Sequence, residues 1–160
     1  MKNIIFLNQT NYNDSLVGPE LIKLCQKGVF LDGNWCCYNK DLSYNEICQN
    51  LILDNMVYLI NNFILANQFD NIVIGWIFQT GVIDKIVSHL NSQNYHIYHF
   101  LLTNTNQADI DDFQLVNKEY DKNYYVEKTS NQIIKESKLD TTNQTSFKIA
   151  LEINKIIQPK

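Results

Sequence analysis

Strand-like apolar runs alternate with helix-like segments along the chain, and this alternation limits its fold more than any other feature. Continuous apolar and aromatic runs, typical of strands buried on both faces, occupy residues 3–8, 28–32, 71–78 and 95–103. A fifth, short strand is predicted at residues 138–142. No linker, repeat or low-complexity tract divides the 160 residues, so we expect one domain over residues 1–160.

Apolar residues with helical spacing fill the intervals between these runs. Val17, Leu21 and Leu24 share one helical face. The same spacing recurs at Ile52, Met56, Leu59, Ile60 and Phe63, at Ile83, Ile86, Val87 and Leu90, and at Phe147, Ala150, Leu151 and Ile157. Strands that alternate with helices predict an α/β fold of three layers, in which helices cover both faces of a parallel sheet.

The composition excludes several classes of function. A hydrophobic fraction of 45% suits a globular protein, and the net charge of -4 argues against a nucleic-acid partner. The opening apolar run is too short for a signal peptide, and no stretch is long enough to span a membrane, so we expect a cytoplasmic protein. The four cysteines and three histidines lack metal-ligand spacing, which predicts reduced thiols and no metal site.

Arginine is absent, so all thirteen basic side chains are lysines. Arginine is the usual residue for bidentate phosphate recognition and for stabilising charge during phosphoryl transfer. An AT-rich genome would explain part of this shortage but not the loss of every arginine.

One segment carries a resemblance to a known family. The stretch "VFLDGNWC" (29–36) resembles "FLDGDWCW" of small P-loop kinases related to shikimate and nucleoside kinases of low-GC bacteria. Residues 53–78 are similar to the next helix and strand of that family, and residues 126–141 look like its lid-following helix and adenine-side turn. The resemblance implies a five-stranded parallel sheet of order 2-3-1-4-5, a P-loop after the first strand, and a lid at about residues 104–125.

The P-loop implied by the resemblance is degenerate. Its position is occupied by Gln9, Thr10, Asn11, Tyr12, Asn13, Asp14 and Ser15. Side chains replace the glycines that let backbone N–H groups approach phosphates. The lysine position falls on Ser15, or on Asp14 if one residue has been deleted, and neither alignment restores the lysine. A lysine about 4 Å from a phosphate contributes roughly 4 kcal/mol of attraction at an effective dielectric of about 20.

Two further features weaken the implied ATP site. Pro19 would break a helix that began at the lysine position, so we expect the helix to begin near Gly18 with Pro19 in its first turn. On the lid side, Lys128 stands where the family carries arginine, and Lys118 and Lys122 lie in the lid segment. These lysines are either point charges at the site or solvated surface residues.

The acceptor side keeps more of the pattern. The resemblance places Asp32 near the acceptor substrate as a base or an orienting group, and Asn34 stands at the family's next carboxylate. Trp35, Tyr38 and Trp76 could line an apolar pocket in which Asp32 and Gln79 are the polar points. The alternative is that these aromatics belong to the core and that Asp32 caps the following turn.

The hypothesis that follows is a kinase-like fold with a decayed ATP site. Such a pseudo-kinase needs no cofactor and retains a small-molecule or protein-binding role. One alternative is an active ATP- and Mg²⁺-dependent phosphotransferase, which acts on a nucleoside or a small hydroxylated metabolite with a lid lysine as substitute. The other is a non-enzymatic interaction module.

Overall fold

A computed structural model describes residues 2–9, 15–36, 46–76, 78, 81–91, 95–104, 125–127 and 133–158. The helices are α1 (Val17–Leu24), α2 (Glu46–Ala66), α3 (Val82–Ser88) and α4 (Ser146–Ile157), with a short 3₁₀ turn, η2, at Gly33–Trp35. The strands are β1 (Asn3–Gln9), β2 (Gly28–Asp32), β3 (Asn71–Trp76), β4 (His96–Thr103), β5 (Tyr125–Glu127) and β6 (Ile133–Asp140).

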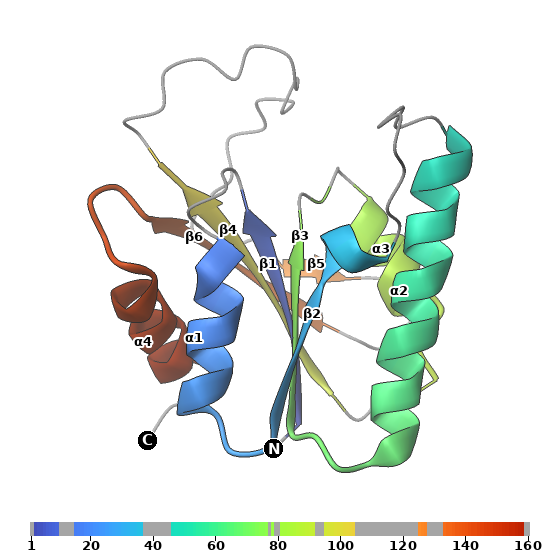
Figure 1. Ribbon diagram of the computed structural model, residues 1–160, viewed down its shortest axis with the longest axis horizontal. Helices are drawn as coiled ribbons and strands as arrows, with labels where there is room; N and C mark the ends of the chain where they lie inside the picture. Colours follow the sequence, from blue (N-terminus) through green and yellow to red (C-terminus); the bar gives the residue numbers. More distant parts are fainter. Residues whose placement is uncertain are drawn as a thin grey trace.

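The sheet has the order β2-β3-β1-β4-β6-β5 (Figure 1). Its first five strands run parallel, and β5 pairs with β6 in the antiparallel sense at one edge. Counted along the chain, the parallel strands have the order 2-3-1-4-5, so the predicted fold class and strand order are confirmed. The antiparallel strand β5 was not predicted.

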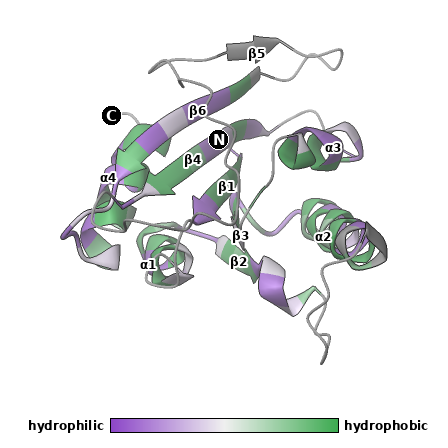
Figure 2. Ribbon diagram, turned by 90° about the horizontal axis from the view of Figure 1, so that it is seen from above, coloured by the Kyte–Doolittle hydropathy of each residue, from purple (hydrophilic) through white to green (hydrophobic). Residues whose placement is uncertain are grey.

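Helices cover both faces of the sheet (Figure 2). On one face, α2 and α3 pack on alternate residues of β1, among them Ile4 and Phe6. On the other, α1 and α4 pack on the intervening residues Ile5 and Leu7. All four side chains are fully buried, which is why the central strand reads as an unbroken apolar run.

Two glycines let α1 approach the sheet. A Cβ on Gly18 would lie 2.1 Å from the Phe30 ring, and a Cβ on Gly75 would lie 3.0 Å from the same ring. The Phe30 side chain of β2 therefore lies between a glycine of α1 and a glycine of β3. A methyl group has no room on Gly18, whereas on Gly75 it would require the Phe30 ring and the end of the Gln9 side chain to shift.

Three expectations about elements need correction. The stretch 126–141, which resembles a lid-following helix, instead contains β5 and β6, because residues 133–140 complete the outer edge of β4 through a parallel ladder. Phe147 is exposed, and the buried face of α4 is formed by Ile149, Ala150, Ile153 and Ile157. Strand β2 lies at the sheet edge and is only partly buried, whereas burial on both faces was expected.

Candidate functional site

The carboxyl ends of the parallel strands meet at one edge of the sheet, where open α/β folds place their ligands. The strands end there at Gln9, Asp32, Trp76, Thr103 and Asp140. Figure 1 shows this edge at the top of the molecule. The family resemblance implies a site at the same edge, so these residues and their neighbours define the candidate site.

Gln9 closes the end of β1 with a buried side chain. It is 6% exposed, and its Nε2 atom would lie 2.6 Å from a Cβ on Gly75 of the neighbouring strand. The amide therefore packs against the α1 side of the sheet, at the position where a P-loop begins in the family that the chain resembles. Residues 10–14 of the predicted loop (Thr10, Asn11, Tyr12, Asn13 and Asp14) lie outside the described residues.

Helix α1 begins at Val17, directly after a 3₁₀ turn at Ser15 and Leu16. The expectation that this helix starts late, with Pro19 in its first turn, is confirmed. The first turn also contains Glu20, whose Oε1 lies 2.6 Å from Lys23 Nζ. Proline lacks an N–H donor, and a carboxylate near a helix N-terminus interacts with the dipole that would otherwise attract an anion.

Asp32 acts as a cap in this structure. Its Oδ1 atom accepts a hydrogen bond of 2.9 Å from the backbone N–H of Asn34 and so caps the η2 turn. This geometry agrees with the capping interpretation of Asp32. A carboxylate has a second oxygen, which the bond to Asn34 does not use.

The two tryptophans of the predicted pocket have different environments. Trp76 packs into the core, with its ring centroid 5.7 Å from that of Phe78, and a Cβ on Gly33 would lie 2.5 Å from its Cγ. Trp35 is 87% exposed. The structure thus does not bring the two indoles together, and the other predicted lining residues, Tyr38 and Gln79, lie outside the described residues.

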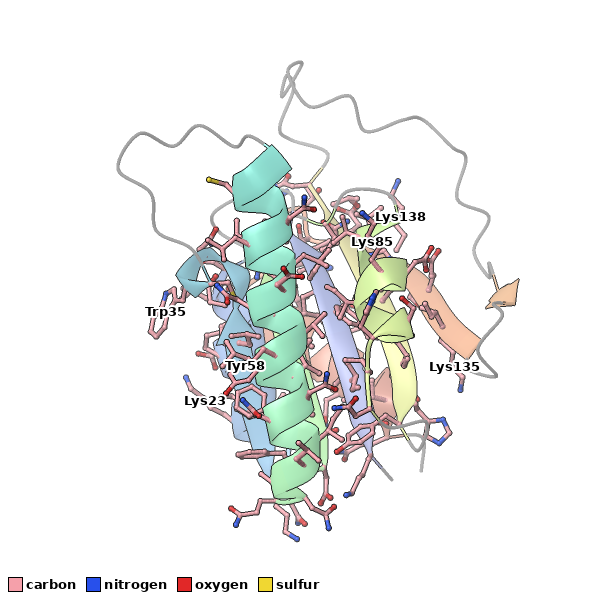
Figure 3. All side chains as sticks on the ribbon, turned by 90° about the vertical axis from the view of Figure 1, so that its right-hand side faces the viewer. Lys23, Trp35, Tyr58, Lys85, Lys135 and Lys138 are labelled. Carbon is pink, nitrogen blue, oxygen red and sulfur yellow. The ribbon has the colours of Figure 1, made fainter. Side chains whose placement is uncertain are left out.

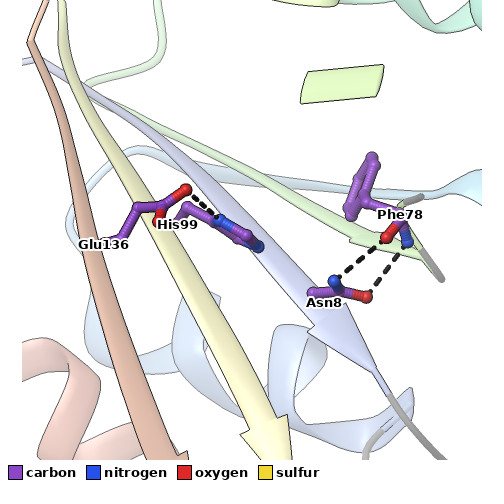
Figure 4. Close-up of polar contacts among 4 residues, drawn as sticks. All are labelled: Asn8, Phe78, His99 and Glu136. Atoms are coloured by element: carbon purple, nitrogen blue, oxygen red, sulfur yellow. Dashed lines mark hydrogen bonds and ion pairs between the residues drawn. The ribbon is translucent and has the colours of Figure 1, made fainter. Parts of the chain in front are cut away.

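Asn8 is a residue of this edge that the sequence analysis did not single out. Its side chain donates to the Phe78 carbonyl oxygen at 3.1 Å and accepts from the Phe78 N–H at 3.0 Å (Figure 4). Both groups are buried. The amide thereby continues the hydrogen bonding of β1 with the chain beyond the end of β3. The signal in the sequence that could have identified Asn8 was a polar residue next to the end of an apolar strand.

The ends of β4 and β6 are joined by threonine hydroxyls. Thr141 donates its backbone N–H and its hydroxyl to the Thr103 carbonyl, at 2.7 and 3.0 Å, and the Thr103 hydroxyl donates to the Leu139 carbonyl at 3.2 Å. Hydrogen bonds from Thr142 hold the pKa of the exposed Asp140 carboxyl below its usual value, and Lys138 lowers it further. The ends of β4 and β6 are therefore held together by hydrogen bonds between their own residues.

A second unpredicted pair lies deeper in the sheet. His99 Nδ1 of β4 and Glu136 Oε1 of β6 are 2.9 Å apart on neighbouring strands, and both side chains are mostly buried (Figure 4). Among the described residues, His99 Nε2 is buried without a hydrogen-bond partner. His99 was weighed only as a metal ligand, and its pairing with a carboxylate was not predicted.

The remaining expected features concern the lid and metal binding. Lys118, Lys122 and Lys128 lie outside the described residues. Within the described residues, no group of three His, Cys, Asp or Glu side chains could hold a metal ion. No helix in the same part of the chain is long and apolar enough to cross a membrane.

Comparisons with known proteins extend the description of the fold. No protein-family model matches the chain, and no curated protein matches it by sequence. A solved structure, that of the Deinococcus radiodurans tunicamycin resistance protein, superposes with a TM-score of 0.57 over 100% of this chain and 98% of that one. At 11% sequence identity this similarity shows the fold alone. The chain therefore shares its α/β fold with that protein.

Proposed function

We propose that this protein is a pseudo-kinase: a kinase-like domain that has lost nucleotide-dependent phosphoryl transfer and acts by binding a small molecule or a protein. Its main support is the junction between β1 and α1. No glycine and no lysine occurs from Asn3 to Val17, the stretch that would have to hold a polyphosphate. On this proposal the protein requires neither ATP nor Mg²⁺.

Phosphate binding at this junction depends on charge and on access to the backbone. A P-loop binds phosphate through backbone N–H groups that only glycine leaves uncovered, and through a lysine worth roughly 4 kcal/mol of Coulomb attraction. Here the only charged residue in the sequence from Asn3 to Val17 is Asp14, which is acidic. Phosphate oxygens approaching this junction would therefore meet like charge instead of a cation.

The described residues agree with this argument. Gln9 places a buried amide where backbone would have to approach a phosphate, and Pro19 removes one N–H donor from the first turn of α1. Each change alone is tolerable in a nucleotide site. Together with the missing lysine, they reduce the donors, the space and the positive charge on which phosphate binding depends.

The binding role rests on the groups that remain on the acceptor side. Asp32 ends β2 and keeps one carboxylate oxygen beyond the bond to the Asn34 N–H. Trp35, on the same turn, presents an exposed indole. A carboxylate next to an aromatic side chain suits a ligand that combines hydroxyl groups with an apolar part.

Isothermal titration of the full chain with ATP and Mg²⁺ tests the proposal. We expect no binding heat at nucleotide concentrations up to about 1 mM, equivalent to a binding free energy weaker than about -4 kcal/mol. Micromolar binding that disappears in Asp14→Ala or Ser15→Ala would overturn it. The variant Asp32→Ala serves as a control, because it leaves the phosphate side unchanged.

A phosphate-release screen separates the alternatives. An active phosphotransferase would consume ATP in the presence of a nucleoside or hydroxylated metabolite, and Lys118→Ala or Lys122→Ala would reduce that consumption if a lid lysine substitutes for the missing one. A pure interaction module would bind no metabolite at all. The pseudo-kinase proposal predicts no consumption of ATP, together with ligand binding that weakens in Asp32→Ala.

A further inference from the structure

The outer face of α2 carries large apolar side chains in an ordered array. Leu51, Tyr58 and Leu65 are 47%, 67% and 69% exposed and follow one another at intervals of seven residues. Seven residues make almost two helical turns, so the three side chains form one stripe along the helix. The stripe lies opposite the residues with which α2 packs on the sheet, among them Ile52, Met56 and Ile60.

Trp35 extends this surface. The Asn55 side chain of α2 donates to the Cys36 carbonyl at 2.7 Å, which fixes the η2 turn against the helix. Figure 3 shows Trp35 and Tyr58 projecting on the same side of α2. We call the four residues Trp35, Leu51, Tyr58 and Leu65 the α2 surface. With about 150–250 Å² per aromatic side chain, its two aromatics alone expose roughly 300 Å².

The α2 surface carries almost no charge. From residue 47 to residue 66 the only charged residue is Asp54, although 19% of the whole chain is charged. A helix that binds a membrane surface carries lysine or arginine on its polar side, and none is present here. A highly charged protein partner would likewise find no counter-charge. The partner must present an apolar and nearly neutral face of similar length.

We propose that this partner is a second copy of the chain, with the two α2 helices packed antiparallel about Tyr58. A two-fold axis at Tyr58 brings Leu51 of one copy level with Leu65 of the other, so apolar groups meet apolar groups. In this arrangement the two Asp54 residues are separated by eight residue positions along the axis, about 12 Å. That distance exceeds the screening length of roughly 8 Å at physiological salt.

The alternative parallel pairing is less favourable. It would place the two Asp54 carboxylates at the same height along the pair, where like charges repel. In the antiparallel pair, Asn62 of one copy comes level with Asp54 of the other, so a neutral amide stands at the height where the parallel pair has a second carboxylate. Self-complementarity of charge therefore selects the antiparallel form.

The α2 surface is small for a dimer interface. A standard interface buries about 800 Å² on each partner, and the α2 surface falls short of this value. We therefore expect a weak dimer that dissociates on dilution in the micromolar range. The α2 surface shares Trp35 with the proposed ligand site, but the dimer does not depend on the proposed loss of nucleotide binding.

Sedimentation velocity over protein concentrations of about 1–200 µM tests the dimer. Tyr58→Asp places two carboxylates at the two-fold axis and should weaken association at least about 30-fold, the factor that corresponds to loss of a hot-spot residue. Phe147→Asp is the matched control, because Phe147 is also an exposed aromatic, 48% accessible, but lies on α4 across the sheet. Thermal denaturation confirms that both variants fold.

Disulfide trapping tests the orientation. A mixture of Leu51→Cys and Leu65→Cys chains should form a disulfide-linked dimer of one chain of each kind. Leu51→Cys chains alone should form no more cross-linked dimer than the wild type, which sets the background from the native Cys48. Efficient cross-linking of Leu51→Cys to itself would overturn the antiparallel arrangement. A wild type that stays monomeric throughout, or a dimer lost equally in Phe147→Asp, would overturn the assignment of the α2 surface.

Discussion

The Asn8 side chain on β1 exchanges two hydrogen bonds with the backbone of Phe78, at 3.1 and 3.0 Å. A neighbouring strand would make the same pair of bonds with the Phe78 backbone, so the Asn8 side chain takes the place of a strand backbone here. The Phe78 ring meets Phe6 at 5.5 Å and Trp76 at 5.7 Å. Asn8 therefore fixes both the chain direction beyond β3 and the aromatic cluster under this edge of the sheet.

Replacing Asn8 by alanine should lower the free energy of unfolding more than most substitutions at this edge of the sheet. It leaves the Phe78 N–H and C=O buried without their partner, at about 1–3 kcal/mol for each unsatisfied group. We expect the free energy of unfolding to fall by about 2–4 kcal/mol, measured by urea denaturation. Asn62→Ala is the control, because Asn62 is exposed on α2. A loss no larger than that of the control would contradict the role assigned to Asn8.

Gly18→Ala should destabilise the protein even though alanine favours helices. The new Cβ would lie 2.1 Å from the Phe30 ring, and overpacking of this kind costs about 1–3 kcal/mol. The gain in helix propensity is at most about 1 kcal/mol. In a Phe30→Ala background the clash disappears, so the same substitution should become neutral or stabilising. Additive effects in this double-mutant cycle would show that Phe30 is not the obstacle.

The substitution Glu136→Ala should lower the free energy of unfolding by more than the partial exposure of Glu136 suggests. It removes the partner of His99 Nδ1 in a ring whose Nε2 already lacks one among the described residues. The expected loss is about 1–3 kcal/mol in the free energy of unfolding, and Glu136→Gln should lose less than half as much because the amide keeps a hydrogen bond. Glu152→Ala, an exposed acidic residue on α4, provides the comparison. Equal losses in Glu136→Ala and Glu152→Ala would rule out a stabilising pair.

Much of the fold could be predicted because parallel strands are buried on both faces. The apolar runs at residues 3–8, 28–32 and 95–103 correspond closely to β1, β2 and β4. Only the end of strand β6 was predicted, as the short strand at residues 138–142, because "IIKESKLD" mixes charged and apolar residues and lacks the apolar run of a buried strand. Its pairing with β4 outweighs that local pattern, and such a long-range contact is invisible in a local sequence window.

The candidate site was predicted less completely than the fold. Asp32 and Trp76 were expected at strand ends and are found there, because strand ends follow from the strands themselves. Their environments were left between two interpretations: Asp32 caps a turn, as one of them had it, whereas Trp35, two residues after Gly33, is exposed and not part of the core. Whether an aromatic side chain packs inward depends on tertiary neighbours, such as Gly33 above Trp76.

The Cys25 thiol should be unreactive in the folded protein. Burial raises its pKa from 9.0 to about 11, and thiol reagents attack the thiolate form. At pH 8 we expect Cys25 to react at least about tenfold more slowly in the native state than in urea, as followed by mass spectrometry of alkylated peptides. Cys48 in the same digest reports whether the reagent was active. Equal rates for Cys25 in the two states would contradict a shielded thiol.

The same shift predicts a dependence of stability on pH. Because the unfolded thiol ionises near pH 9 and the folded thiol near 11, the unfolded state binds fewer protons between these values. The stabilising contribution is therefore complete below about pH 9 and is lost as the pH rises toward 11. We expect a loss of about 1 kcal/mol, because Cys25 is only half-buried and solvent screens the full shift. In Cys25→Ala, the free energy of unfolding measured by urea denaturation should not show this part of the decline with pH. Equal declines in the variant and the wild type would assign the decline to other groups.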